Sequence, residues 1–375
     1  MVFHNNLNAW TELLMLPKCV LCAPPTQGRS NDTSVAAFTL DRLSRWEAGE
    51  RRSLWDDTPS YKNASPNTSD TARKTRAVAL ARDGLDGKAC AALTSTGLAR
   101  ENAANANKMR ALHPTAPLPP KTPTADLSLP PDIDTDLVHK CLRSFPADTA
   151  PGPTGMRVQH LLDALTPGYK TTLLEQLTAL VTLLARGAAP GELAPHLAGA
   201  KLFAASKKDD GVRPIAVGEA LRRLVAKTLC EPSKKDAREY LWPLQVGCGS
   251  PLGAEIAIHT LRQWCSRNAD TGKVLLKIDF SNAFNCVSRA AALHEVREHF
   301  PRLARWAEWC YAVRSNLVFG SHTLSSETGV QQGDPLGPLL FSLAIHPIAK
   351  ELLAQGKMAS QGTSSTWFSS TSTMG

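Results

Sequence analysis

The sequence predicts an α+β fold, and three observations support this class. Apolar residues recur at helical spacing in residues 161–185, 220–230 and 253–266. Short β-prone runs alternate with these helices, at residues 201–205, 273–280 and 316–319. The chain has 375 residues, of which 43% are hydrophobic, so it is long enough to bury a sizeable core. Helices and short strands mixed in this way are typical of an α+β or α/β domain.

The composition points to a basic protein of a reducing compartment. The formal net charge is +8, and residues 201–240 hold ten Lys/Arg against six Asp/Glu, so this segment carries half of the excess. A basic surface suits nucleic acid. The nine cysteines are scattered without a disulfide framework. No apolar run approaches the roughly 20 residues that span a bilayer, and the N-terminus lacks a signal-peptide pattern, so we expect an intracellular protein of the nucleus or cytoplasm.

Residues 1–111 predict a mostly helical N-terminal region. Apolar side chains are spaced as in helices around Trp10 and again around Leu43. Cys19 and Cys22 form a C-x-x-C pair, which can be half of a zinc site or two ordinary thiols. Because no second pair follows at zinc-site spacing, the second interpretation is favoured.

A proline-rich segment, residues 112–132, separates this region from the rest of the chain. Seven prolines lie between His113 and Pro131. Proline fixes φ and removes a hydrogen-bond donor, so the segment is predicted to be an extended linker or a strap that follows the surface. A folded unit is expected to follow, over residues 133–356.

The first loop of interest in that unit is APGPTG, residues 150–155, which precedes an amphipathic helix containing Arg157 and His160. A lone histidine on such a helix is more often a satisfied structural residue than a catalyst. We therefore assign His160 no chemical role.

A basic hairpin is predicted next, within residues 201–229. Asp209, Asp210 and Gly211 form a turn signal, and Lys207, Lys208 and Arg213 flank it. Cations on a hairpin suit a triphosphate, because Arg and Lys bind phosphate well. A solvated basic hairpin is the alternative.

The run KVLLKIDF, residues 273–280, is predicted to be a buried strand that ends at Asp279. A carboxylate at the carboxyl end of a buried strand is a frequent metal-binding or catalytic position. A turn or helix N-cap aspartate is an equally acceptable interpretation. Phe284, five residues further on, would pack beside whatever Asp279 binds.

The last patterned segment is ETGVQQGDPLGPLLFSLAIHPI, residues 327–348. Three glycines and two prolines predict a rigid loop that leads into an apolar helix beginning near Leu339. A backbone with so few side chains allows a flat or polyanionic ligand to approach closely.

Together these four segments resemble the ordered blocks of reverse transcriptases, specifically those of non-LTR (LINE-type) retrotransposons. The blocks APGPTG, RPIAVGEALRRLVAK, DFSNAFNCVSR and GVQQGDPLGPLLFSL carry the resemblance, which covers residues 133–353. It implies a right-hand polymerase fold, with fingers and an incomplete palm. It also implies RNA-templated DNA synthesis, in which a primer 3′-OH attacks the α-phosphate of a deoxynucleoside triphosphate.

The resemblance further implies roles for individual residues. Asp279 would be the catalytic carboxylate that binds Mg²⁺, and the carbonyl of Phe280 would lie beside the metal. Phe284 would select deoxynucleotides by crowding the sugar. The remaining nucleotide-binding residues would be Arg213 with a lysine (Lys201, Lys207 or Lys208), together with Gln332 and Gly333. The basic segment 201–240 would also follow the template backbone.

One block of the family is not found. An aromatic-x-Asp-Asp hairpin should come next, but no aspartate follows Asp334 in these 375 residues. Two Mg²⁺ ions about 4 Å apart repel by on the order of 17 kcal/mol at an effective dielectric constant of about 20, and one carboxylate cannot offset this. We therefore expect a domain truncated before the catalytic pair, without a thumb and without polymerase activity. A palm strand left without its neighbour should also be prone to aggregation.

The tail, residues 357–375, is rich in Ser and Thr and has no pattern, so we expect it to be disordered. Codons for its last nine residues permit the shifted reading VLFYLDDG, and we hypothesise a frameshift that replaced the catalytic block. The expected partners are an RNA template, a DNA primer and deoxynucleoside triphosphates, and Mg²⁺ is the expected cofactor. A non-enzymatic RNA-binding protein that uses the basic fingers is the alternative function.

Overall fold

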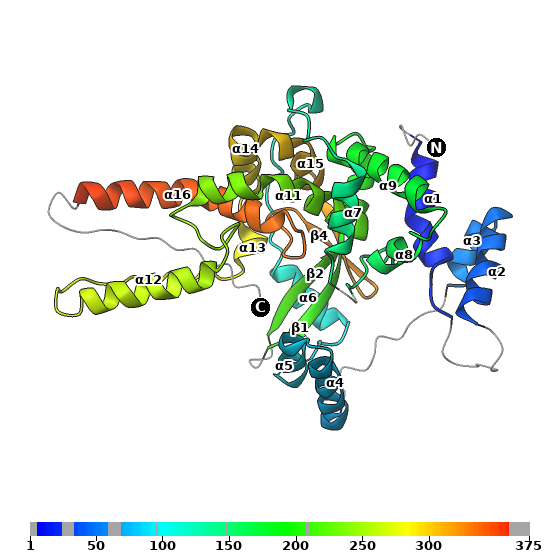
Figure 1. Ribbon diagram of the computed structural model, residues 1–375, viewed down its shortest axis with the longest axis horizontal. Coiled ribbons are helices and arrows are strands. Elements are labelled where there is room, and N and C mark those ends of the chain that lie inside the picture. Colours follow the sequence, from blue (N-terminus) through cyan, green and yellow to red (C-terminus); the bar gives the residue numbers. More distant parts are fainter. Residues whose placement is uncertain are drawn as a thin grey trace.

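A computed structural model describes residues 6–24, 34–58, 69–94, 97–146, 149–207 and 211–359. In these ranges the chain forms a helical body around a small sheet, from which several elements project (Figure 1). The mixture of helices and strands agrees with the predicted class.

The sheet contains four strands in the order β2-β1-β3-β4. Strands β1 (Ala200–Ser206) and β2 (Val212–Gly218) are antiparallel, so the hairpin predicted from the Asp-Asp-Gly turn is confirmed. Strand β1 also pairs in parallel with β3 (Ser315–Phe319), which continues into β4 (His322–Ser326). The sheet is therefore mixed, and segments more than 100 residues apart meet in it.

Helix α6 (Ala103–Ala111) covers one face of this sheet. Its residues Ala106 and Met109 are buried against Leu202 and Phe319. The end of the N-terminal region thus contributes to the core that supports the β1–β2 hairpin.

A second, larger core lies among helices. Its principal members are α7 (Thr135–Arg143), α9 (Lys170–Ala185), α11 (Ala220–Leu241), α14 (Arg289–His299), α15 (Pro301–Tyr311) and α16 (Gly337–Ala359). Shorter elements complete it: α8 (Val158–Asp163), η2 (Gly191–Leu193), α10 (Ala194–Leu197) and α13 (Ala283–Cys286).

Two helices differ from the sequence-based expectation. The helix predicted over residues 161–185 is split into α8 and α9, because Pro167 and Gly168 interrupt it. Helix α11 extends well beyond residue 230, to Leu241. The predicted apolar helix after the Gly-rich segment is confirmed as α16.

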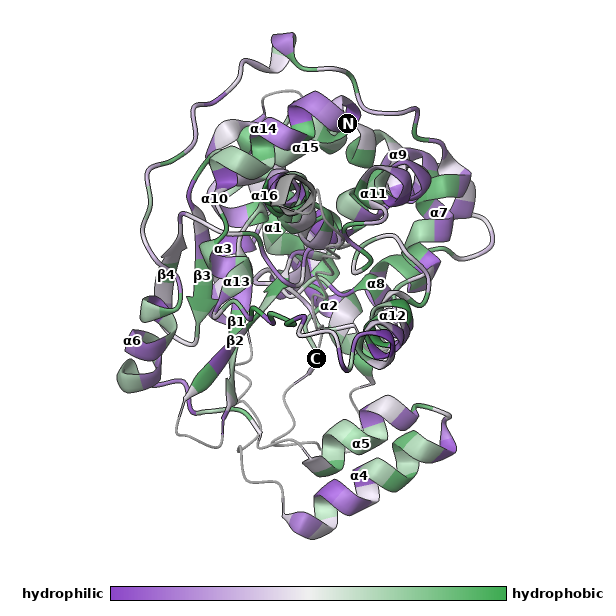
Figure 2. Ribbon diagram, turned by 90° about the vertical axis from the view of Figure 1, so that its left-hand side faces the viewer, coloured by the Kyte–Doolittle hydropathy of each residue, from purple (hydrophilic) through white to green (hydrophobic). Residues whose placement is uncertain are grey.

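The proline-rich segment follows the surface of the body as a strap (Figure 2). It includes the short helix η1 (Thr124–Asp126). The Arg305 guanidinium of α15 donates to the carbonyl oxygens of Leu127, at 2.8 Å, and Ser128, at 3.1 Å. The Thr122 hydroxyl donates to the Glu308 carboxylate. A proline-rich segment cannot pair its backbone carbonyls in a β-ladder. The hydrogen bonds from Arg305 satisfy two of them instead.

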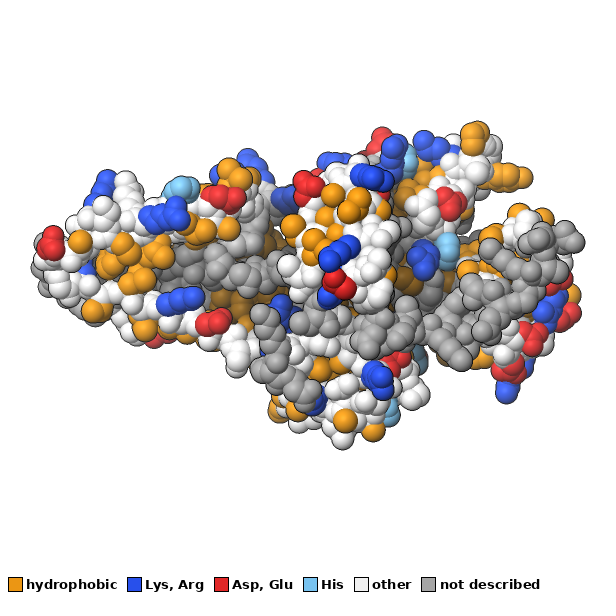
Figure 3. Space-filling view, turned by 90° about the horizontal axis from the view of Figure 1, so that it is seen from below, with side chains coloured by type: hydrophobic (Ala, Val, Ile, Leu, Met, Phe, Trp, Pro, Cys, Tyr) orange, Lys and Arg blue, Asp and Glu red, His pale blue; other side chains and the backbone are white. Residues whose placement is uncertain are grey.

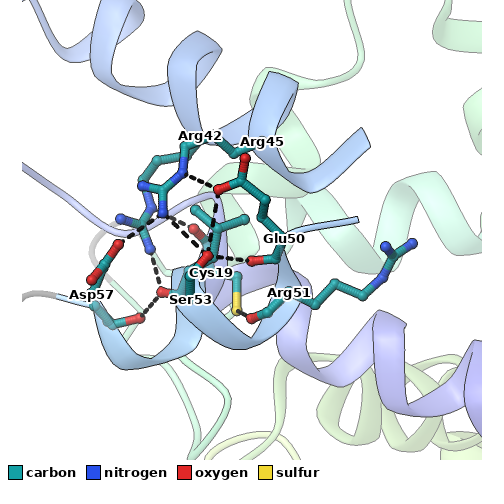
Figure 4. Close-up of polar contacts among 9 residues, drawn as sticks. Cys19, Arg42, Arg45, Glu50, Arg51, Ser53 and Asp57 are labelled. Carbon is teal, nitrogen blue, oxygen red and sulfur yellow. Dashed lines mark hydrogen bonds and ion pairs between the residues drawn. The ribbon is translucent and has the colours of Figure 1, made fainter. Parts of the chain in front are cut away.

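The N-terminal unit consists of α1 (Leu7–Cys19), α2 (Val35–Glu47) and α3 (Arg51–Asp56). The buried guanidinium of Arg42 donates to the carbonyl oxygens of Cys19 and Leu54, near the ends of α1 and α3 (Figure 4). A cation stabilises the C-terminus of a helix because its charge is attracted to the negative end of the helix dipole. Cys19 and Cys22 are free thiols, and burial raises the pKa of both.

Helices α4 (Asp70–Arg82) and α5 (Asp86–Thr94) form a separate helical hairpin below the sheet in Figure 2. No helix in the described ranges is both long enough and apolar enough to cross a membrane.

The strand predicted over residues 273–280 is not formed. This segment has no regular secondary structure and no strand partner, and its apolar side chains are open to solvent: Val274 is 88% exposed and Leu276 is 81% exposed. Together with α12 (Gly253–Arg267) it makes up the arm, residues 252–280, in which Gly253 alone is buried. The prediction was wrong because β-prone residues form a strand only when a neighbouring strand satisfies their backbone groups.

Apolar side chains therefore collect on the end of the molecule that carries α12 (Figure 3). The tail from residue 360 onward, on which the frameshift hypothesis was based, lies outside the described residues.

Candidate functional site

One face of the β1–β2 hairpin carries cations. Side chains alternate between the two faces of a strand, and the register places Ala205 opposite Arg213 and Lys201 opposite Val217. Lys201 and Arg213 therefore share a face, the one opposite to that covered by α6. Arg213 and Lys207 are exposed. Lys208 lies outside the described residues.

The Gly-rich loop, residues 329–337, lies against the backbone of β2. A Cβ atom on Gly333 would come within 2.2 Å of the carbonyl oxygen of Ala216, so only glycine fits there. Both Gln332 and Gly333 are exposed at the tip of the loop. Two of the predicted nucleotide-binding positions thus lie beside the strand that carries Arg213.

Phe284 also joins this loop. Its carbonyl oxygen accepts a hydrogen bond from the N–H of Val330 at 2.7 Å, and its ring stacks on Phe341 of α16 with centroids 4.8 Å apart. The amides of Asn282 and Asn285 in turn donate to the carbonyl of Leu112, at the end of α6. The segment that follows Asp279 is therefore hydrogen-bonded to the Gly-rich loop on one side and to the end of α6 on the other.

No contact described for Asp279 or Phe280 holds these residues against the hairpin or the Gly-rich loop. Both are exposed on the arm, outside any helix or strand. Within the described ranges, no group of three or more His, Cys, Asp or Glu side chains is arranged to hold a metal ion. The described residues thus do not fit a magnesium ion at Asp279, and we assign no catalytic step to a metal.

The start of α11 contacts both the APGPTG loop and the Gly-rich loop. The sequence did not predict this role. Glu219, which is 2% exposed, precedes the helix and accepts hydrogen bonds from the Thr154 N–H and hydroxyl, both at 2.7 Å. Burial raises the pKa of Glu219, although the bonds from Thr154 oppose this. A Cβ on Gly152 would lie 2.7 Å from the Cα of Glu219, so the APGPTG loop packs directly on α11.

Arg222, one turn further on, binds the Gly-rich loop. Its guanidinium and the Asp334 carboxylate form an ion pair at 2.8 Å, and each side chain is 1% exposed. The Tyr311 hydroxyl donates to the same carboxylate at 2.7 Å. Burial raises the pKa of Tyr311 well above its ordinary value, so the phenol remains protonated.

Arg223, the next residue of α11, donates to the carbonyl of Ala150 at 2.7 Å.

Because Arg222 is buried and paired with Asp334, it is not available to a ligand. This differs from the expectation that the whole basic segment, residues 201–240, follows a template. A signal was present in the sequence: charged residues stand inside the apolar run of the ALRRLVA segment, and a buried charge needs a partner. His160 likewise has a structural role, since its Nδ1 accepts from the Arg157 N–H at the start of α8.

The arrangement is that of a site for a polyanion, with exposed cations on an open strand face and a glycine backbone beside them. Residues 205–361 match the model of the family described as reverse transcriptase (RNA-dependent DNA polymerase). This match supports a reverse transcriptase domain in that part of the chain, which includes β2, α11, the arm and the Gly-rich loop.

A curated relative is the retrotransposable element SLACS 132 kDa protein of Trypanosoma brucei gambiense. The two sequences are 27% identical over 219 residues, which is 56% of this chain and 18% of that protein. The matched part of the chain thus spans less than a fifth of the relative's length.

Proposed function

We propose that this chain is a reverse-transcriptase-like protein of a non-LTR, LINE-type retrotransposon, with fingers and part of a palm of the right-hand polymerase type. The observation that carries the proposal is the meeting of the Gly-rich loop with the β1–β2 hairpin. Gly333 touches β2, the strand that bears Arg213, and the family match covers the loop and β2.

In this proposal the cation-bearing face of the hairpin binds phosphate. Arg213 is exposed and can bind two phosphate oxygens through its planar guanidinium, while Lys201 and Lys207 supply point charges. Gln332 and Gly333 support the base of a deoxynucleoside triphosphate or of an RNA template. Phe284, which is hydrogen-bonded to the loop through Val330, limits the space available to the sugar of the nucleotide.

We further propose that the 375-residue polypeptide does not by itself catalyse RNA-templated DNA synthesis with Mg²⁺. Of the aspartates in the four blocks, Asp334 is buried in its ion pair with Arg222. Asp279 is thus left alone where two metal ions need several carboxylates, and it is exposed on the arm. Primer extension on an RNA template tests this. We expect no product above background, and extension that disappears in Asp279→Ala would overturn the proposal.

The alternative function is RNA binding without catalysis. It is favoured by the exposure of Arg213 and Lys207 and by the position of Asp279 outside any metal-holding group of the described residues. Filter binding of single-stranded RNA at increasing salt tests this alternative. Three cations at the hairpin predict a slope of log K against log salt of about −2, and Arg213→Ala should reduce it by about 0.7.

The matched control is Arg302→Ala, an exposed arginine at the start of α15. It should leave the salt slope unchanged. RNA binding with no salt dependence, or equal effects of the two variants, would exclude the hairpin as the RNA site.

A further inference from the structure

The exposed tip of the Gly-rich loop is supported from the interior. Inside the loop, the Asp334 N–H donates to the Gln331 carbonyl and the Gly337 N–H donates to the Asp334 carbonyl. These two bonds form turns but do not fix the loop to the protein. Gln332 and Gly333 lie at the solvent side, while Gln331 and Asp334 on either side of them are buried.

The Asp334 carboxylate is the main point of attachment. One of its oxygens accepts from both Arg222 and Tyr311, and the other accepts from the N–H of Leu336 at 3.0 Å. A buried carboxylate bound by this set of donors is held in one geometry. Three elements, α11, α15 and the loop, are thereby joined at a single side chain.

Gln331 provides the second attachment. Its N–H donates to the Tyr311 hydroxyl at 3.3 Å, and its Nε2 donates to the carbonyl of Ala198 at 2.9 Å. Arg222 donates to that same carbonyl. Tyr311 therefore contacts the loop both before and after its exposed tip. Arg222 binds the loop after the tip and shares the Ala198 carbonyl with Gln331.

We propose that Arg222 and Tyr311 are positioning residues, which hold the Gly-rich loop so that Gln332 and Gly333 face the cation-bearing strand β2. Neither side chain reaches solvent, so each acts through the loop and not on a ligand. The inference rests on the proposed function in one respect, namely that a deoxynucleoside triphosphate is the molecule the loop supports.

The test compares Tyr311→Phe with Trp309→Phe in the full chain. Tyr311→Phe removes one hydroxyl and both of its hydrogen bonds to the loop. Trp309, on the same helix, is 7% exposed and donates to the carbonyl of Ala189, so its replacement costs one buried hydrogen bond away from the loop. Hydrogen exchange of the amides of residues 330–337, thermal unfolding and binding of dTTP with Mg²⁺ are measured for each.

Two lost hydrogen bonds predict exchange in the loop about tenfold faster in Tyr311→Phe, and dTTP binding about tenfold weaker. The control should lower the melting temperature without accelerating exchange in the loop. Arg222→Lys, which keeps the charge but not the planar fork, should behave like Tyr311→Phe.

Unchanged loop exchange in Tyr311→Phe would overturn the inference, and so would equal acceleration in the control. Faster loop exchange with unaltered dTTP affinity would reduce the role to stability alone. If the unmodified chain binds no dTTP, the nucleotide part of the proposed function fails, whereas the exchange measurement still decides whether Tyr311 holds the loop.

Discussion

The start of α11 and the arm, residues 252–280, both lie in the part of the chain that matches the family, but they differ in how their polar residues are used. At the start of α11, each charged side chain is buried and paired: Glu219 binds Thr154, Arg222 binds Asp334, and Arg223 binds the carbonyl of Ala150. On the arm, Asp279 and the apolar residues before it are exposed. A sequence motif therefore becomes a defined geometry only where another element of the chain meets it.

The comparison also separates two requirements of a nucleotidyl-transfer site. Binding a polyanion needs cations and close backbone approach, and in the proposed function the hairpin and the Gly-rich loop supply them. Catalysis of phosphoryl transfer needs positioned carboxylates as well. The described part of the chain brings together the first set and leaves Asp279 alone.

Breaking the ion pair should have the largest effect. Arg222→Met leaves the Asp334 carboxylate buried without its cation, and should lower the free energy of unfolding by about 3–5 kcal/mol. Arg262→Met on the exposed arm should change it by less than about 0.5 kcal/mol. Denaturant unfolding measures both, and similar losses would show that α11 is no better anchored than the arm.

The packing of α11 against α16 should depend on pH through His346. This side chain is 1% exposed, and its Nδ1 lies 3.0 Å from the Gln245 amide. Burial, with Lys350 and His299 nearby, lowers its pKa to about 4. The folded protein thus resists protonation that the unfolded chain accepts below about pH 6.5, so stability is present above that pH and lost as the pH falls toward 4.

The loss should reach about 3 kcal/mol, at roughly 1.4 kcal/mol per pKa unit. Unfolding free energies measured between pH 7 and 4 test this, and His346→Gln should flatten the dependence. His259→Gln, an exposed histidine of α12, is the control. An identical pH dependence in the parent and His346→Gln would contradict the prediction.

Crowding the contact between the APGPTG loop and α11 should cost less. Gly152→Ala places a Cβ 2.7 Å from the backbone of Glu219, which predicts a loss of about 1–3 kcal/mol. Gly87→Ala in α5, where nothing lies within 4 Å of the new atom, should instead stabilise by up to about 1 kcal/mol. Thermal unfolding distinguishes the two, and opposite signs are the expected result.

The smallest effect is expected on the arm itself. Leu276→Ser should change the free energy of unfolding by less than about 0.5 kcal/mol, because the side chain is already 81% exposed. Chymotrypsin should also cleave within residues 274–280 before it cleaves the helices of the body. A loss above 1 kcal/mol, or resistance to cleavage, would show that the arm is packed in solution.

Local signals sufficed where a single segment decides its own structure. The Asp-Asp-Gly turn predicted the hairpin, and the proline and glycine spacing predicted the start of α16. They failed at residues 273–280, where the strand pattern is strong but no pairing partner is met. They also failed at Arg222, whose basic character suggested an exposed surface although the side chain is buried.

By itself, the sequence determined the class of fold, the hairpin and the order of the four motif segments. The tertiary structure decided which motif residues meet. Burial gives Arg222, Asp334 and Tyr311 a shared function that their separation in the chain conceals, because a charge removed from water must find its partner wherever the fold brings one. For the same reason Asp279, left in water, has no such constraint on its position.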